Sequence, residues 1–161
     1  MSVEENKALI NHYFSPPPPS QEAIQRMREA KDPTVEGRRL FKAHFEGIMA
    51  PDFVSHDSTG DRNREQSLQM NLELMAAFPG SRWAMDRMVA EGDLVVVLGK
   101  MMGTHRGAYK GTPPTGKKVE LGYTVTYRIA EGRVVEAWSS MDWLGLMQQI
   151  GAIPSAPPPT P

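Results

Sequence analysis

The chain has 161 residues and no cysteine, and its 18 basic and 19 acidic side chains give a formal net charge of −1. This length is typical of one domain that buries a core and a pocket, while the missing cysteines exclude disulfides, thiolate metal ligands and thiol nucleophiles. A nearly neutral chain without a long apolar run is expected to be a cytoplasmic protein with no nucleic-acid partner, membrane partner or signal peptide.

Four helices are predicted in the first half of the chain. The first begins after Ser2, a good N-cap, and ends before the prolines at 16–19, which cannot continue a helix and favour an extended spacer. The others are expected over residues 21–31, 34–49 and 65–78. Apolar side chains at helical spacing give the third helix a clear buried stripe.

The hydrophobic period changes to two after Gly80, which indicates strands. A short extended segment at 53–57 and a loop at 59–64 precede that change. Helices followed by an antiparallel meander form an α+β pattern, so we expect a curved antiparallel sheet wrapped around the N-terminal helices. The predicted strands cover residues 83–90, 94–105, 119–129 and 133–140, and a closing helix follows with Gly151 as its C-cap.

Alternation along these strands predicts which side chains face the enclosed side of the sheet, although a β-bulge would shift part of the assignment. The inward set is Val97, Gly99, Met101 and His105, then Tyr123, Val125, Tyr127 and Ile129, and finally Val135, Ala137 and Ser139. Within this set, the predicted substrate-binding residues are Met101, Val125, Tyr127, Ile129, Ala137 and Ser139.

Five pieces of the sequence resemble the SnoaL-like polyketide cyclase (ester cyclase) family. They are residues 50–57 (APDFVSHD), 77–80 (AFPG), 103–117 (with GTHRG and GTPPTGK), 132–138 (GRVVEAW) and 142–151 (DWLGLMQQIG). The similarity extends over residues 4–14 and 50–151. It implies a conical α+β barrel of the nuclear-transport-factor type, usually a homodimer through its sheet, with an apolar pocket closed by the helices.

The resemblance also implies a chemistry from which this sequence departs. The best-understood members of the family close polyketide rings by an intramolecular aldol reaction, without metal or cofactor. Their acid/base group is an aspartic acid in a His-Trp-Asp run on the last strand, and a further histidine lies on the preceding strand. Here the run reads Ala137-Trp138-Ser139, and Val125 stands near the second histidine position. Serine cannot replace a carboxyl whose pKa an apolar pocket raises, so the fold is expected to carry over and the cyclase activity is not.

The resemblance also sets the expected domain organisation. Residues 1–153 are predicted to form a single SnoaL-like domain, and residues 154–161 a Pro-rich tail. The segment 16–37 lengthens the usual connection after the first helix, so it is predicted to be an insertion. It would cover the pocket, extend a dimer contact or remain a solvated decoration.

Four residues are candidates for acid/base chemistry: His105, His56, Asp142 and Tyr123. His105 is expected to face inward, and His56 to stand near the cavity mouth, where an imidazole would exchange protons at neutral pH. Each candidate has a structural alternative, such as helix capping by Asp142 or a bond from Tyr123 to the main chain. His44 and His12 are interpreted as structural or surface residues. No third ligand accompanies His56 and His105, so no metal site is predicted.

The leading functional hypothesis is a cofactor-independent enzyme that acts on a small apolar polyketide- or terpenoid-like molecule. It would be a cyclase, isomerase, dehydratase or hydrolase, in which Tyr123 or Tyr127 stabilises a developing oxyanion. A non-catalytic binding module of the same fold is the main alternative, because the expected acid is missing. An epoxide hydrolase is a third hypothesis, although the sequence places no Asp-Arg-Asp network.

Overall fold

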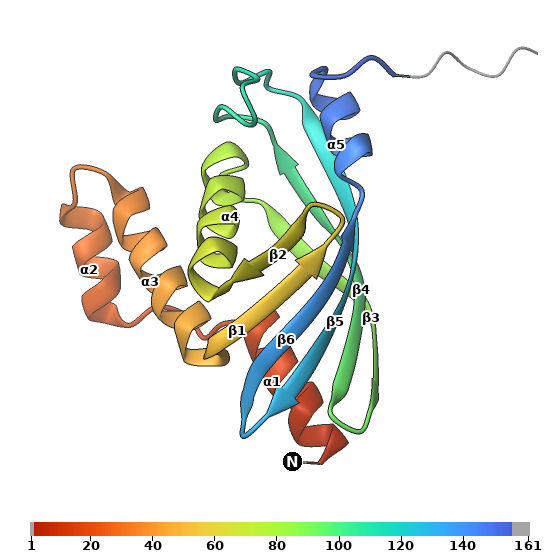
Figure 1. The fold of residues 1–161 in the computed structure, drawn as a ribbon. Helices are drawn as coiled ribbons and strands as arrows, with labels where there is room; N and C mark the ends of the chain where they lie inside the picture. Colours follow the sequence, from red (N-terminus) through yellow and green to blue (C-terminus); the bar gives the residue numbers. More distant parts are fainter. Residues whose placement is uncertain (1, 156–161) are drawn as a thin grey trace, which may run out of the picture.

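The structure is a computed structural model in which residues 2–155 are described. Five helices and six strands form an α+β fold, with the helices gathered mainly on one face of a curved sheet (Figure 1). All but the first two residues of the predicted Pro-rich tail lie outside the described residues. No helix of the described part is long and apolar enough to cross a membrane.

The helices begin and end at residues with clear capping chemistry. They are α1 (Val3–Phe14), α2 (Gln21–Glu29), α3 (Pro33–Ile48), α4 (Arg64–Ala77) and α5 (Trp143–Ile150). Ser2 caps α1 in a capping box with Glu5, because side-chain oxygens satisfy the free N–H groups of a first turn. Gly151 ends α5 with a φ of 83°, a left-handed conformation that glycine adopts without a steric penalty.

The strands form one sheet in the order β2-β1-β6-β5-β4-β3. Their bounds are β1 (Met49–Asp57), β2 (Gly60–Asn63), β3 (Arg82–Glu91), β4 (Leu94–Thr104), β5 (Lys118–Ala130) and β6 (Arg133–Met141). β1 runs parallel to β6, and the other neighbours are antiparallel. The prediction of a loop at 59–64 was wrong for β2, a short polar strand that pairs with the end of β1 and carries no hydrophobic alternation.

A bulge near the start of β6 corrects one inward assignment. Arg128 pairs with Glu136, but Ile129 pairs with Val134, so Val135 is the extra residue. Val134 is fully buried and Val135 is partly exposed. The bulge therefore turns Val134 inward in place of Val135, while the alternation from Glu136 onward follows the prediction.

The core divides into two clusters on the inner face of the sheet. The cavity cluster joins α1, α3 and the start of α4 to β1 and the middle of the sheet; its buried members include Ile10, Phe45, Phe53, Val97, Tyr123, Val125, Tyr127 and Ala137. The packed cluster joins α5 and the end of α4 to the end of β4 and the start of β5. It includes Leu74, Phe78, Met101, Val119, Leu121, Leu146 and Ile150.

The predicted insertion at 16–37 contains α2 and the first turn of α3. Figure 1 places α2 on the side of α3 that faces away from the sheet. Glu36 joins the two helices, because its carboxylate accepts hydrogen bonds from Arg26 at 3.0 Å and from Arg39 at 2.7 and 2.8 Å. These bonds hold the pKa of Glu36 far below its usual range, at about 2. That this segment is an insertion, with residues 1–153 as one domain, remains a prediction.

Candidate functional site

A cavity of about 240 Å³ lies between the inner face of the sheet and helices α1, α3 and α4. Eight of its lining residues are phenylalanine, tyrosine or tryptophan, from a total of twelve in the chain. Aspartate, glutamate, lysine and arginine are absent from the described residues that line it. The aromatic lining residues are Tyr13, Phe14, Phe41, Phe45, Phe53, Trp83, Tyr123 and Tyr127. The cavity is thus an apolar chamber. Its described lining residues include one histidine, His44, and no other residue of the charged types.

Strand register determines how the floor of the cavity is arranged. Ser55 of β1 lies opposite Ala137 of β6, which lies opposite Tyr127 of β5. In the next inward row, Ser139 lies opposite Val125. The two positions that resemble the family's His and Asp therefore face the cavity, and they carry a methyl group and a hydroxymethyl group. This floor has space where a larger acid or base would stand.

The hydroxyl of Tyr123 binds the backbone. Its Oη donates to the carbonyl of Ala84 on β3 at 3.1 Å. Gly99 permits this contact, because a Cβ there would lie 2.1 Å from the Ala84 oxygen and 2.6 Å from Tyr123 Oη. Burial and the nearby Asp86 raise the pKa of Tyr123 to about 12, so the phenol stays protonated at neutral pH.

Two other tyrosines bring phenol groups to the cavity. The rings of Tyr13 on α1 and Tyr127 on β5 meet edge to face, with centroids 6.2 Å apart. Burial raises the pKa of both; the nearby Tyr123 phenol adds to the rise at Tyr13, and the Tyr13 and Tyr123 phenols add to it at Tyr127. Both are therefore neutral hydrogen-bond donors near pH 7. The sequence placed Tyr127 inward but did not assign Tyr13 to the site; its helical spacing with Ile10 was the available signal.

A short chain of polar groups crosses from the sheet to α4. Ser55 and Ser67 share a hydrogen bond of 2.9 Å between their hydroxyl oxygens, and the Asn71 amide donates to the Ser67 carbonyl at 2.8 Å. All three residues line the cavity. The sequence analysis missed this group, although Ser55 shares the inward face of β1 with Phe53 by alternation.

His44 of α3 also lines the cavity, beside Phe41 and Phe45. Its Nε2 lies 3.1 Å from the Tyr13 carbonyl oxygen, and its ring is parallel to the Tyr13 ring at 6.0 Å. The interpretation of His44 as a structural residue therefore accounts for the contact of Nε2 but not for Nδ1. Its place on the apolar stripe of α3 was the signal for a cavity position.

The structure brings together five of the predicted pocket residues, namely Tyr123, Val125, Tyr127, Ala137 and Ser139. Met101 faces inward as expected but belongs to the packed cluster, and Ile129 belongs to the core of the cavity cluster without lining the cavity. Apart from Val135 at the bulge of β6, the alternation selects the correct face of each strand. It does not say where along that face the helices leave a space.

His105 is fully buried, but not in the cavity. Its ring packs on Phe78 of the packed cluster, with centroids 5.4 Å apart. Nδ1 accepts from the Thr115 backbone N–H at 3.3 Å and lies 3.0 Å from the Thr115 hydroxyl, while Nε2 has no partner among the described residues. These contacts hold the 105–117 loop against the end of the barrel.

His56 lies on the outer face of the sheet, beside Trp138. Its Nδ1 is 2.7 Å from Asp61 and its Nε2 is 2.9 Å from Glu136, which also binds Arg128. The hydrogen bonds to Asp61 and then Glu136 raise the pKa of His56. Because Ser55 faces the cavity, the next residue along β1 must face away from it.

Asp142 lies at the start of α5, outside the cavity. Its carboxylate accepts from the Gly145 backbone N–H at 2.9 Å, which is the capping alternative. Among the described residues, no group of three or more His, Asp or Glu side chains is arranged to hold a metal ion. The lining also lacks the Asp and Arg groups that an epoxide hydrolase needs.

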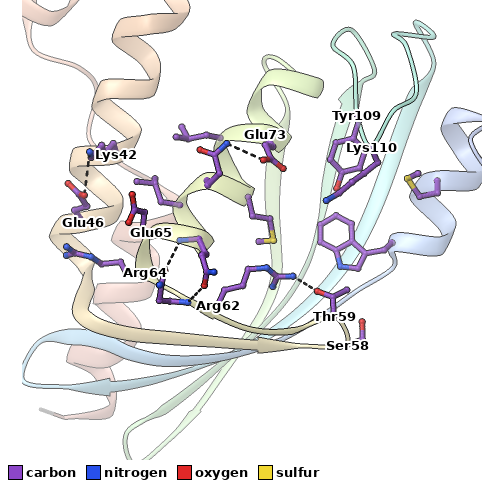
Figure 2. A pocket seen from close by; sticks show the side chains of 18 residues that line it. Lys42, Glu46, Ser58, Thr59, Arg62, Arg64, Glu65, Glu73, Tyr109 and Lys110 are labelled. Atoms are coloured by element: carbon purple, nitrogen blue, oxygen red, sulfur yellow. Dashed lines mark hydrogen bonds and ion pairs between the residues drawn. The ribbon is translucent and has the colours of Figure 1, made fainter.

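A larger groove of about 1300 Å³ lies on the other side of α4. Figure 2 shows its walls, with Lys42 and Glu46 on α3, Glu73 on α4, and Tyr109 with Lys110 on the 105–117 loop. Most of the residues that line it have charged or polar side chains. Ligand sites are usually enclosed and apolar with a few convergent polar groups, so the inner cavity is the better candidate.

Comparison with known proteins identifies the family. The family model described as SnoaL-like polyketide cyclase matches residues 25–150. The chain belongs to this family. No curated protein matches the sequence at a significant level. The match includes the β6 run Ala137-Trp138-Ser139, whose first and last residues line the cavity, so the departure from the expected catalytic residues lies inside the family domain.

Solved structures agree with this assignment. A SnoaL-like polyketide cyclase candidate from Jannaschia sp. CCS1 has a TM-score of 0.73 and 25% identity, over 94% of this chain and 95% of that one. AclR, a candidate hydroxylase from Streptomyces galilaeus, has a TM-score of 0.76 and 22% identity, over 98% and 87%. IdmH, a candidate polyketide cyclase from Streptomyces antibioticus, has a TM-score of 0.67 and 23% identity, over 91% and 98%. The predicted conical α+β fold is therefore confirmed.

Proposed function

We propose that this protein is a cofactor-independent enzyme that binds a small, mainly apolar carbonyl compound in the inner cavity and transforms it by acid/base chemistry. The observation that carries the proposal is the aromatic cavity with phenol donors among its lining residues. Its volume of about 240 Å³ lies just below the range of about 300–1,000 Å³ for drug-sized ligands. The substrate is therefore a polyketide- or terpenoid-like molecule with one or two rings.

Within this proposal, Tyr127 is the donor to the substrate carbonyl. A neutral phenol in an apolar site stabilises negative charge that develops on oxygen far better than it would in water. Tyr123 already donates to the Ala84 carbonyl, so its role is to shape the cavity and hold β3 and β5 together. This arrangement suits isomerisation, cyclisation or dehydration through an enolate; hydrolysis would additionally need a placed water molecule.

A non-catalytic binding module is the second candidate function. The observation that favours it is the lack of any carboxylate among the described residues that line the cavity. The same aromatic walls and phenol donors would then hold a ligand without changing it. The two functions differ in one measurable property, namely whether bound ligand exchanges protons with the protein.

The test uses 2-tetralone, a two-ring ketone with exchangeable hydrogens next to its carbonyl. Binding is followed through the fluorescence of Trp83, which lines the cavity, in a variant with Trp138→Phe and Trp143→Phe. Enolisation is followed by proton NMR as exchange of those hydrogens for deuterium. We expect saturable binding and exchange about a hundredfold faster than in buffer.

Ala137→Phe fills the floor of the cavity and should abolish both signals, whereas Ala43→Phe, at an exposed position of α3, should retain them. Binding without exchange would establish the binding module instead of the enzyme. Equal signals in Ala137→Phe and the parent would place the ligand outside the cavity and contradict both functions.

The proposal includes a homodimer formed through the outer face of the sheet. Val89, Leu94, Leu98 and Trp138 are exposed to between 38% and 61%, and all lie on strands whose inner face holds the core. Leu98→Glu should shift the sedimentation coefficient to that of a monomer, and an unchanged coefficient would contradict this interface. The cytoplasmic location and the absence of nucleic-acid and membrane partners remain predictions.

A further inference from the structure

The proposed acid/base function requires a group that accepts a proton at neutral pH, and the lining offers few. The hydroxyls of Ser55 and Ser67 bind each other, and the Asn71 amide does not titrate. The phenols of Tyr13, Tyr123 and Tyr127 have raised pKa values, so they are protonated donors. Among the described lining residues this leaves a single imidazole, that of His44.

Backbone contact determines which nitrogen of His44 is available. A carbonyl oxygen only accepts hydrogen bonds, so the contact of Nε2 with the Tyr13 carbonyl at 3.1 Å places the proton of the neutral ring on Nε2. The Nδ1 lone pair is then free to accept a proton. None of the ion pairs among the described residues includes His44, so no carboxylate occupies this nitrogen.

Packing holds the His44 ring in a defined orientation. The ring stacks on Tyr13 with an interplanar angle of 4°, and His12 approaches it edge-on at 5.1 Å. Tyr13 and His12 are the titratable side chains of α1 that face this ring. Tyr13 in turn contacts the ring of Tyr127, which links the imidazole to the phenol that faces the substrate carbonyl in the proposed function.

We propose that His44 is the general base of this enzyme, an inference that rests on the proposed function. Nδ1 takes a proton from the carbon next to the substrate carbonyl. The C–H electron pair forms a carbon–carbon double bond, and the carbonyl π pair moves to the oxygen, which Tyr127 stabilises by hydrogen bonding. Return of the proton from the imidazolium to a different carbon of the enolate system completes an isomerisation, and return of a deuteron to the same carbon, after the imidazolium has exchanged its proton with D2O, gives the measured exchange. In a cyclisation the enolate carbon attacks a second carbonyl carbon, and the imidazolium proton goes to the oxygen of that carbonyl.

This assignment moves the base from the last strand to α3. In the positions that resemble the family's catalytic run, the chain has Ala137 and Ser139, neither of which is a base. Shortening of the side chain at 137 leaves space on the cavity floor between Ser55 and Tyr127. His44 of α3 lines the same cavity from the helical side.

The test measures 2-tetralone binding and deuterium exchange in His44→Gln. We expect exchange to fall about a hundredfold or more, as for the loss of a general base, while the dissociation constant changes less than about threefold. His56→Gln is the matched control, because this imidazole lies on the outer face of the sheet and is bound by Asp61 and Glu136, and it should keep parental exchange.

Each outcome separates the two proposals. Exchange in His44→Gln equal to that of the parent would overturn the role of His44 and leave the enzyme proposal intact. Binding without exchange in the parent would overturn both, in favour of the binding module. If His44→Gln does not fold, His44→Ala with added imidazole replaces it: recovery of exchange supports a base at this position, and failure of imidazole to restore exchange in the folded variant contradicts it.

Discussion

The cavity cluster and the packed cluster lie on the same inner face of one sheet, but they differ in the side chains that close them. The packed cluster is closed by aliphatic side chains from α4 and α5, such as Leu74, Leu146 and Ile150. The cavity cluster is bounded by aromatic rings, which are rigid and leave space where small residues such as Ala137 and Ser139 stand between them. The difference teaches that short side chains among rigid rings, rather than the fold alone, make the chamber.

The largest expected effect comes from the row between the two clusters. Gly99→Ala would place a methyl group against the Ala84 carbonyl and the Tyr123 hydroxyl. Because one of these atoms belongs to the backbone, β3 or β4 must shift, and we expect a loss of about 1–3 kcal/mol in the free energy of unfolding. Urea denaturation measures it, with Gly122→Ala, where a Cβ meets open space, as the control. Equal stability of the two variants would contradict this close packing.

A matched pair of valines compares the clusters directly. Val119 and Val125 lie on the same strand, and each is 5% exposed, but only Val125 lines the cavity. Val119→Ala should cost about 2 kcal/mol, from about 0.8 kcal/mol per buried methylene plus the new void. Val125→Ala enlarges an existing cavity and should cost about 1 kcal/mol, while changing the affinity for 2-tetralone. Equal losses in urea denaturation would show that both regions are equally well filled, and the opposite order would contradict the comparison.

Asp142 caps α5, a helix of the packed cluster, and substitutions there distinguish a capping role from a catalytic role. Asp142→Ala should lose about 1 kcal/mol of stability, whereas Asp142→Ser should retain most of it by accepting the same bond from Gly145. Neither variant should alter ketone exchange. If both variants lost exchange to the same extent while Asp142→Ser kept its stability, Asp142 would have a catalytic role.

The smallest effect concerns the outer face of the sheet. Bonds to Asp61 and Glu136 raise the pKa of His56 above its unfolded value, so protonation of His56 stabilises the folded state. This stabilisation is complete below the unfolded pKa of about 6.5 and is lost as the pH rises through the folded pKa. The stability difference between the parent and His56→Gln should therefore shrink as the pH rises above about 6.5. A difference that stays constant in urea titrations would contradict this.

Much of the fold could be predicted because hydrophobic spacing and capping residues report local structure directly. The helix ends at Ser2 and Gly151 and the four long strands are examples. β2 was not predicted because it is polar and four residues long. Val135 was assigned to the wrong face because a bulge leaves no mark in the alternation. The site was harder. His105 and His56 have suitable chemistry, but their distance from the cavity depends on which helices pack where.

His44 shows the converse case. Its helix and its apolar stripe were predicted, yet an apolar stripe does not distinguish a filled core from the wall of a chamber. The decisive facts are three-dimensional, namely the Tyr13 carbonyl that occupies Nε2 and the short residues on the opposite strand. Neither is encoded in residues close to His44 in the sequence.

The uncharged, aromatic lining of the cavity has a consequence for how ligands would be ranked. A chamber with apolar walls and a few hydroxyl donors resembles octanol, which also forms hydrogen bonds, more than it resembles a pure hydrocarbon. Across a series of ketones of similar size, affinity should therefore follow the octanol–water partition coefficient. It should also be almost independent of salt concentration, because the cavity offers a neutral ligand no ion pair to be screened.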